Sequence, residues 1–524
     1  MSATSASDFA CNGNVVVDAV GLQQKAARPA GRFFFALAAL PAGLRAAQNE
    51  DLAALSRQVK ELMAQGRFEQ AIPLCEQLVK AVPGNTGLLL NLGLAEQMAG
   101  HPDKAAPRFE EVLRTEPGNV PALNSLASSE LQLGQPQAAI PPLKKLLALQ
   151  PSNNEARGML ASAFLGAGDL DEAAVQYRKL TAVTPTDSKA WYGLGKTYQE
   201  QSARLFDRLE KKGPQSAYVA ALIGASRLKA QQYHSAFFFF KEAERSLPPI
   251  RGVHSGLAVI YGKAGHAGWA AIEERKEDSL PPPNCANNPS ECFFVQNRYA
   301  EAAKSASPSA SDAQLYWGIK AYDQLALEVF ARLEALPESL ELHALHAQLA
   351  HGRNQDLEAA AEWRAALKLS PGNSRLEGEL TTSLFLAHDY NAAIPMIEKL
   401  RKGDERSPDL NFMMGESLLR TEQPENAVPY LEDALRANPN MLPAHASLGL
   451  ALAKVNRDRE AIPHLEKALE LDDDGALHYQ LSHAYQQEGN TTRATALMAQ
   501  YQEIQKRNQE EKEEITKDVQ IVGP

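Results

Sequence analysis

Three short groups of residues carry side chains whose types and spacing could do chemistry. Gly195-Lys196-Thr197 resembles the end of a phosphate-binding loop, in which glycines and a lysine cradle phosphate oxygens. His343, His346 and His351 are close enough in sequence to share one helix, as metal-ligating histidines often do. Asp472-Asp473-Asp474 offers the oxygen ligands that calcium prefers. Each of these chemistries also requires particular residue types at fixed sequence positions before or after the group.

None of the three groups has the neighbours that its chemistry requires. A phosphate-binding loop needs a glycine where the chain has Ala190, and a strand before it. The histidines do not form an H-E-x-x-H pattern, and a calcium loop would need a glutamate where the chain has Leu481. No other catalytic constellation survives inspection. We therefore expect no catalytic residue, no cofactor and no metal site, and a chain that is not an enzyme.

The chain instead shows an internal period of 34 residues. Four prolines are separated by this interval, and four alanines keep the same step twelve residues ahead of them. The prolines are Pro83, Pro117, Pro151 and Pro185, and the alanines are Ala71, Ala105, Ala139 and Ala173. A period of this length indicates stacked copies of one small unit. The elements that position any functional residue are therefore the elements of this unit.

Each unit contains two apolar-periodic stretches separated by a turn and closed by the proline. In the second unit the apolar side chains recur at steps of three and four, which is typical of amphipathic helices rather than strands. These side chains are Leu89, Leu92, Ala95, Ala105, Phe109 and Val112. The proline ends the second helix, because it lacks the N–H that the helix ladder needs. The unit is therefore predicted to be a pair of antiparallel helices.

The residues of these units resemble the tetratricopeptide repeat. Trp191, Leu194, Gly195 and Tyr198 spell the pattern W-x2-L-G-x2-Y, and the alanine and proline positions agree in register. The resemblance covers roughly residues 52 to 506. It implies an all-α solenoid, a right-handed superhelix of antiparallel helix pairs with about a dozen repeats, some of them degenerate. With the leader described below, the chain resembles an exported bacterial member of this family.

The register of the repeats favours a packing role over a metal-binding role for the candidate histidines. Several histidines occupy the fourth place of their units, the place that Trp191 holds in its own unit. They are His254, His343, His445 and His478. A flat ring reused at one place indicates a packing position rather than a metal site. In the same way, Asp474 is expected to cap the helix that follows it, since free helix N–H groups favour a carboxylate.

The middle of the chain departs from the regular pattern. Two similar stretches, 192–213 and 316–336, belong to a duplication about 124 residues long that is built around a shortened unit. Each stretch could be one long helix or two short ones. The predicted segments are a leader at 1–47, four units at 48–187, a middle region at 188–311, a C-terminal repeat region at 312–506 and a charged tail at 507–524. The tail is expected to continue the final helix as a solvating cap, with a docking tail as the alternative.

Family resemblance also suggests where a partner would bind. In tetratricopeptide proteins the first helix of each unit lines a concave groove that holds an extended peptide or a partner's helix. Carried over in register, the groove residues of this chain are Asn124, Ser128, Gln132, Phe412, Glu416, Arg420, Tyr479 and His483. This set mixes aromatic, amide and charged groups. It lacks the lysines and asparagines with which some members of the family clamp a terminal carboxylate.

The leader and two cysteines bear on the cellular compartment. Basic residues precede the apolar run 33–40, and the small Ala46 and Ala47 follow it, which resembles a secretory signal peptide. We expect a periplasmic or secreted protein, with a cytoplasmic protein carrying an N-terminal extension as the alternative. Cys285 and Cys292 flank a proline-rich interruption of the repeats and could form a disulfide in an oxidising compartment, or remain two thiols.

Charge and composition narrow the class of partner. The formal net charge of −11 argues against nucleic acid, whose phosphates require concentrated lysine and arginine. The run Phe237–Phe240 spreads over most of a helix circumference, so some of these rings need cover from a neighbouring unit or from a partner. The expected function is a non-catalytic scaffold that binds a protein or a peptide. The alternatives are an accessory subunit that positions a separate enzyme, and a binder of an envelope polysaccharide.

Overall fold

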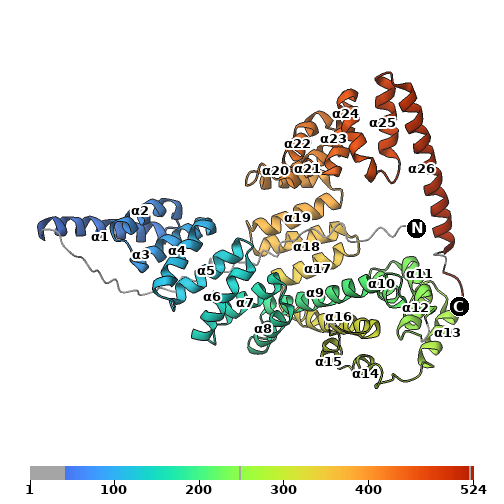
Figure 1. The fold of residues 1–524 in the computed structure, drawn as a ribbon, viewed down its shortest axis with the longest axis horizontal. Helices are drawn as coiled ribbons and strands as arrows, with labels where there is room; N and C mark the ends of the chain where they lie inside the picture. The colour runs from blue at the N-terminus through green and yellow to red at the C-terminus, as the bar shows by residue number, and fades with distance from the viewer. Residues whose placement is uncertain (1–41, 247–248, 308, 519–520) are drawn as a thin grey trace. The chain divides into compact units, whose positions relative to one another are not determined.

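The structure is a computed structural model that describes residues 42–246, 249–307, 309–518 and 521–524. Within these ranges every regular element is a helix, and most helices form consecutive antiparallel pairs joined by short turns (Figure 1). The predicted class, an all-α solenoid of helix pairs, is confirmed. The greater part of the predicted leader lies outside the described residues, and the first helix begins at Ala42.

The helices follow one another along the chain without any strand in the described ranges. The first half comprises α1 (Ala42–Ala64), α2 (Phe68–Ala81), α3 (Thr86–Met98), α4 (Pro102–Thr115), α5 (Val120–Gln132), α6 (Pro136–Leu149), α7 (Asn154–Ala167), α8 (Leu170–Val183), α9 (Ser188–Lys212), α10 (Ala217–Lys229), α11 (Tyr233–Glu244), α12 (Val253–Lys263) and α13 (Ala267–Asp278). The second half comprises α14 (Pro289–Val295), α15 (Tyr299–Lys304), α16 (Asp312–Glu334), α17 (Leu340–His351), α18 (Asp356–Leu369), α19 (Ser374–Leu386), α20 (Tyr390–Arg401), α21 (Pro408–Arg420), α22 (Pro424–Ala437), α23 (Leu442–Lys454), α24 (Asp458–Ala468), the short 3₁₀ helix η1 (Leu469–Leu471), α25 (Ala476–Gln487) and α26 (Thr491–Asp518).

The boundaries of the helices follow from local chemistry. Each of α2, α4, α6 and α8 ends two residues before its repeat proline, as the missing N–H requires. The next helix is then opened by a polar cap. Asn85 accepts a hydrogen bond from the backbone N–H of Leu88 at 3.1 Å, and Asn119 accepts one from Ala122 at 3.0 Å. These caps satisfy N–H groups that have no partner inside the helix.

The two helices of a unit pack closely at its eighth residue, where the residues are counted so that Trp191 is the fourth residue of its own unit. A Cβ atom added at Gly415 would lie 2.5 Å from Cγ of Leu431 on the paired helix. One added at Gly449 would lie 2.6 Å from a methyl carbon of Leu465. Both distances are shorter than carbon atoms allow, so glycine at this place permits the helices to pack. The two helices of each unit therefore cross closely at Gly415 and at Gly449.

The described chain divides into two compact units. The first contains the residues up to Arg204 together with Ile319–Leu336, and the second contains Leu205–Gly318 and the residues from Pro337 onward. This division differs from the predicted segment boundaries near 188 and 312. The difference arises because α9 and α16 each contribute residues to both units.

The two irregular stretches are single long helices, α9 and α16. In the first unit, a Cβ atom at Gly195 would lie 2.3 Å from a ring carbon of Phe330, so α16 packs where a second helix of the α9 repeat would stand. The rings of Tyr198 and Tyr322 lie 6.1 Å apart. These two tyrosines are equivalent positions of the 124-residue duplication, which here contact one another.

Two further features of the second unit bear on the sequence predictions. In α11, Phe237 and Phe240 are buried, while Phe238 and Phe239 are half-buried and pack edge to face on each other. The repeat core therefore covers two of the four rings. At the other end, α26 continues to Asp518, so much of the charged tail belongs to the final helix. Among the described residues, no helix is both long and apolar enough to cross a bilayer.

Candidate functional site

The groove residues predicted on α5 differ in their accessibility. Gln132 is exposed, Asn124 is half-buried and Ser128 is buried. Ser128 belongs to a helix that is covered by its neighbours on several sides, and α5 contacts α3, α4, α6 and α7. Of the three residues, Gln132 therefore offers the most surface to a partner and Ser128 the least.

Phe412 on α21 belongs to an aromatic cluster that links three helices of the second unit. Its ring lies 6.1 Å from that of Phe385 on α19, and Phe385 lies 5.8 Å from Tyr390 on α20. All three side chains are half-buried. Both contacts are edge to face, the arrangement that the charge distribution of aromatic rings favours. We call Phe385, Tyr390 and Phe412 the aromatic cluster.

Glu416 lies one turn beyond Phe412 and connects neighbouring first helices. One carboxylate oxygen accepts a hydrogen bond from Nε of Arg420 at 2.7 Å, and the other accepts one from the hydroxyl of Ser447 on α23 at 2.5 Å. Glu416 is buried, whereas Arg420 is exposed. The carboxylate of Glu416 raises the pKa of Arg420, so this side chain keeps its charge. Arg420 therefore presents a fixed cation, and Glu416 acts mainly as its anchor.

Tyr479 and His483 are both exposed on α25. Their rings lie 4.6 Å apart, and the ring of Tyr501 on α26 lies 5.5 Å from that of Tyr479. These residues therefore form an aromatic surface near the last described repeat. The structure does not bring them into contact with the aromatic cluster.

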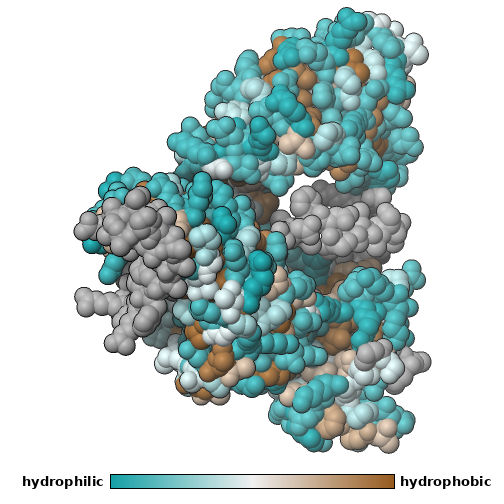
Figure 2. Space-filling view, turned by 60° about the vertical axis from the view of Figure 1, so that its left-hand side comes forward, coloured by the Kyte–Doolittle hydropathy of each residue, from teal (hydrophilic) through white to brown (hydrophobic). Residues whose placement is uncertain are grey.

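Two shallow clefts lie elsewhere on the second unit. A cleft of about 420 Å³ is lined by Asn440, Leu442, Glu466, Lys467 and Glu470. A second cleft of about 400 Å³ is lined by Glu425, Val428, Pro429, Glu432, Val455 and Arg457. Neither contains a predicted groove residue. The face shown in Figure 2 is mostly hydrophilic, and its hydrophobic residues lie in separate patches.

The phosphate-binding and calcium-binding patterns are parts of helices and caps. Thr197 donates its hydroxyl hydrogen to the carbonyl of Gly193 at 2.7 Å inside α9 and is buried. Asp472 accepts hydrogen bonds from the backbone N–H groups of Leu477 and His478, at 2.9 and 2.7 Å. Asp472 is therefore a principal cap of α25, whereas the sequence pointed to Asp474. Asp474 adds a bond from the N–H of Ala476 at 2.9 Å.

The three histidines near α17 meet carboxylates rather than one another. His343 lies 2.7 Å from Glu362 and 2.9 Å from Glu338. His351 contacts Asp356 at 2.5 Å. Burial alone would lower the pKa of His343, but the hydrogen bonds to Glu362 and Glu338 outweigh it and raise that pKa. These contacts are side-chain hydrogen bonds to carboxylates, and the contacts of His343 are ion pairs when its ring is protonated.

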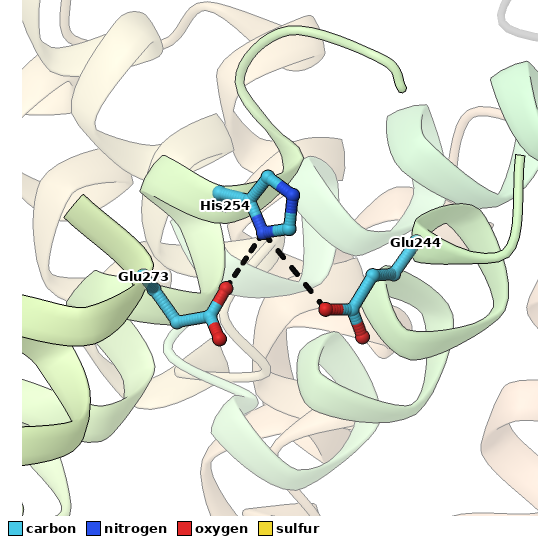
Figure 3. A group of neighbouring side chains, drawn as sticks. All are labelled: Glu244, His254 and Glu273. Atoms are coloured by element: carbon cyan, nitrogen blue, oxygen red, sulfur yellow. Dashed lines mark hydrogen bonds and ion pairs between the residues drawn. The ribbon is translucent and has the colours of Figure 1, made fainter. Parts of the chain in front are cut away.

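A cluster that sequence reasoning missed joins α11, α12 and α13 (Figure 3). Nδ1 of His254 lies 2.6 Å from a carboxylate oxygen of Glu273 and 3.9 Å from one of Glu244. Glu273 is completely buried. An imidazole and two carboxylates are ligand types that Zn²⁺ takes, and in the described part of the chain these three residues form a group close enough to hold an ion.

Lysines already balance the charge of this cluster. Nζ of Lys276 lies 2.7 Å from Glu273 and 3.4 Å from Glu244, and Lys241 is also paired with Glu244. Burial would lower the pKa of Lys276, but its hydrogen bonds to the two carboxylates raise it. A metal ion would have to displace this ammonium group. The arrangement therefore suits a closed ion-pair network that fastens three helices together.

A spacing signal in the sequence could have found these contacts. In several units the fourth residue contacts the residue 19 positions later, on the second helix of the same unit. The pairs are His254 with Glu273, His343 with Glu362 and His445 with His464. The same place also reaches back six residues, since Nε1 of Trp191 donates to the carbonyl of Pro185 at 2.8 Å. The fourth place therefore connects three successive helices.

Cys285 and Cys292 are joined as a disulfide, with Cα atoms 5.6 Å apart. The loop that they close precedes and enters α14. Arg251 holds this loop against α12 through Glu291 at 3.2 Å and the carbonyl of Pro281 at 2.7 Å. The pair is therefore compatible with a disulfide, and its oxidation in the cell stays a prediction.

Comparisons with known proteins agree with the repeat assignment. The tetratricopeptide repeat family matches residues 62–129 and 130–197. The family described as anaphase-promoting complex, cyclosome, subunit 3 matches residues 387–468. No curated protein matches the sequence significantly.

Three similar solved structures each cover about a third of this chain. MamA is 18% identical over 31% of this chain and 96% of its own, with a TM-score of 0.28. MamA from Desulfovibrio magneticus RS-1, from residue 41 to its end, is 21% identical over 32% and 96%, with a TM-score of 0.29. YrrB, described as a TPR protein with an unusual peptide-binding site, is 25% identical over 34% and 91%, with a TM-score of 0.29.

The fold and the matched repeats define a helical-repeat protein of the kind that acts as a scaffold for protein–protein interaction. Residues 62–197 of the chain are tetratricopeptide repeats, and the helix pairs of the other described ranges have the same all-α architecture.

Proposed function

We propose that this chain is a scaffold that binds a peptide segment or a helix of a partner protein along the first helices α19 and α21. The aromatic cluster next to Arg420 is the observation that supports this proposal. It combines half-buried rings with an exposed cation that Glu416 holds in place. Aromatic residues and arginine are the residue types that most often dominate the binding energy of protein interfaces.

The geometry around Arg420 favours a protein ligand over a sugar polymer. The hydrogen bond from Nε to Glu416 leaves the other guanidinium nitrogens of this half-exposed side chain able to donate to a carbonyl or a carboxylate of a partner. Phe412 is half-buried and makes one edge-to-face contact within the cluster, so part of its ring stays accessible to an apolar side chain of a partner. A partner would therefore pack an apolar side chain on Phe412 and place an acceptor on Arg420.

We also propose that the protein works in the cell envelope. The basic, apolar and small-residue order of the leader and the Cys285–Cys292 pair support an exported protein. In this setting the scaffold assembles other envelope proteins. An accessory role, in which the repeats position a separate enzyme, uses the same surface and differs only in the identity of the partner.

The experiment is an affinity capture with four forms of the full chain: the wild type, two test variants and one control variant. The wild type, Phe412→Ala and Arg420→Glu are immobilised and exposed to envelope extract, and the captured proteins are identified by mass spectrometry. Arg436→Glu is the matched control, because Arg436 is an exposed arginine on the second helix α22. Circular dichroism melting confirms that each variant is folded.

We expect a defined protein that the wild type and Arg436→Glu capture equally. Phe412→Ala and Arg420→Glu should each reduce its affinity about tenfold or more, as truncation of an interface hot spot does. Capture that is equal in all four forms would contradict the proposed surface. Binding of a purified glycan in the absence of any captured protein would instead favour the polysaccharide function.

A further inference from the structure

The last described residues of the chain contact α12, far away in sequence. The hydroxyl of Tyr261 donates a hydrogen bond to the carbonyl oxygen of Val522 at 2.7 Å. Both residues belong to the second unit. The segment Ile521–Pro524, which we call the terminal segment, has no regular secondary structure and lies after α26 in the chain.

Tyr261 is placed so that its hydroxyl needs an acceptor. The residue is completely buried, and its ring packs edge to face on Phe237 at 5.8 Å and on Trp269 at 5.6 Å. A buried phenol without a hydrogen-bond partner is costly, so tyrosines in such places normally find one. Burial, with smaller effects from Glu273 and Glu244, raises the pKa of Tyr261 to about 12, so the hydroxyl remains a donor. Val522 supplies the acceptor.

The residue after Val522 fits against Trp269 because it is glycine. A Cβ atom at Gly523 would lie 3.2 Å from two ring carbons of Trp269 and 3.6 Å from its Nε1. The ring of His266 stacks on that of Trp269, with the two ring centres 4.0 Å apart. The indole therefore crowds position 523, where glycine packs without displacing the ring and a larger side chain would have to push it aside.

The contact relies on backbone more than on side chains. The side chain of Val522 is half exposed, and its carbonyl is the group that α12 recognises. Recognition of an extended segment through its main chain, with a position that admits only a small residue, is typical of peptide-binding surfaces. The surface thus fits an extended apolar peptide that carries glycine next to the bonded carbonyl.

We propose that the surface formed by Tyr261 and Trp269 is a peptide-docking site and that the terminal segment of the same chain occupies it. This site is separate from the aromatic cluster and does not depend on the function proposed above. A foreign peptide of the same kind could bind there only after the terminal segment has left. The terminal segment is thereby an intramolecular competitor.

The test places a photo-crosslinking amino acid, benzoylphenylalanine, at position 522 of the full chain. This substitution keeps the main-chain carbonyl and replaces a side chain that is half exposed. Irradiation is followed by gel separation of monomer and dimer and by peptide mapping. Tyr261→Phe and Gly523→Val are the test variants. Tyr479→Phe, which also removes one hydroxyl, and Gly268→Ala, where a Cβ meets open space, are the matched controls.

We expect crosslinks within one chain that map to α12 and α13. Their yield should fall about fivefold in Tyr261→Phe, the factor that one hydrogen bond typically supplies, and by more in Gly523→Val. Both controls should keep the wild-type yield. The proposal is wrong if Tyr261→Phe and Gly523→Val crosslink like the wild type, or if the crosslinks map to other helices. Crosslinked dimers would show that a second copy, not the same chain, fills the site.

Discussion

At the scale of single residues, the repeats are held together by side chains that recur at fixed places. The glycine of the eighth place allows two helices to cross, and the polar residue of the fourth place connects three helices. Gly415 and His254 represent these two roles. Because these residues hold helices together, we expect their substitution to lower the free energy of unfolding rather than to change a partner-binding surface directly.

Gly415→Ala should destabilise the protein. The added methyl group would lie 2.5 Å from Leu431, so the helices must separate, and overpacking of this kind costs about 1–3 kcal/mol. Gly378→Ala is the control, since its Cβ meets nothing within 4 Å and the substitution in α19 should stabilise the helix by about 0.5–1 kcal/mol. Urea unfolding of both variants measures the difference. Equal midpoints would contradict the close crossing.

His343→Gln should make the stability less dependent on pH. The pKa of His343 is raised in the folded protein, so the charged ring contributes stability that is fully present below the ordinary histidine pKa of 6.5. This contribution is lost as pH rises through the raised folded value. We therefore expect His343→Gln to lower the urea midpoint at pH 5.5 much more than at pH 8.5. The exposed His483, substituted in the same way, is the control. A loss that is larger at pH 8.5 would reverse the assigned direction.

Features that depend on a residue's place in the 34-residue repeat could be predicted from the sequence, and features that depend on neighbouring repeats could not. The shared place of Trp191 and of the histidines followed from the 34-residue period. The burial of Ser128 and Glu416 did not, because it depends on the neighbouring first helix and not on the unit itself. The cluster around His254 was also missed, although its 19-residue spacing to Glu273 is present in the sequence.

At the scale of elements, the departures from the repeat are as informative as the copies. A shortened unit leaves α9 without a second helix of its own, and α16 packs against it in the first unit through Phe330. The sequence showed that the two stretches are related but could not show that each is one helix. Helix length there is decided by the partner helix, which lies more than a hundred residues away and which local signals do not reveal.

The proline-rich interruption before α14 is a second such departure. Whether its cysteines, Cys285 and Cys292, form a disulfide can be tested by thiol labelling, with Cys75 of α2 as a buried free thiol for comparison. Burial, together with the nearby carboxylates Glu96 and Glu76, raises the pKa of Cys75 to about 11. In native protein at pH 8, a thiol-alkylating reagent should leave Cys75 unlabelled until the chain is unfolded. Cys285 and Cys292 should be labelled only after reduction.

Peptide mass spectrometry of protein isolated under acid trapping reads all three sites. Reduction of the disulfide should also lower the unfolding free energy by about 2–3 kcal/mol, the value expected for so short a closed loop. Labelling of Cys285 and Cys292 without reduction would show that they are free thiols. It would also remove one of the two supports for an oxidising compartment.

At the scale of the whole molecule, the chain contains stacked repeats and two segments on which the proposed compartment rests. These segments are the leader 1–47 and the loop between Cys285 and Cys292. The all-α solenoid followed from the period, since stacked units repeat the same short-range contacts. The division into two compact units did not, because it depends on how α9 and α16 pack. No pattern in the repeats bears on the compartment, which rests on the leader and on the cysteines.

Export predicts a shortened N-terminus. The mature protein should lack most of residues 1–47 and should fractionate with the envelope, because a signal peptide is removed during translocation. N-terminal sequencing of the protein from fractionated cells provides the measurement. A cytoplasmic protein that retains residues 25–47 would show that the leader is an extension and not a signal.

The central claim is that the first-helix surface around Arg420 contacts a partner protein. Site-specific photo-crosslinking in living cells tests it most directly, with benzoylphenylalanine placed at position 420 and, as the control, at position 436 on α22. We predict that a discrete protein adduct forms from position 420 and not from position 436. Adducts of equal yield from both positions, or none from position 420 while the protein is folded and abundant, would contradict the account.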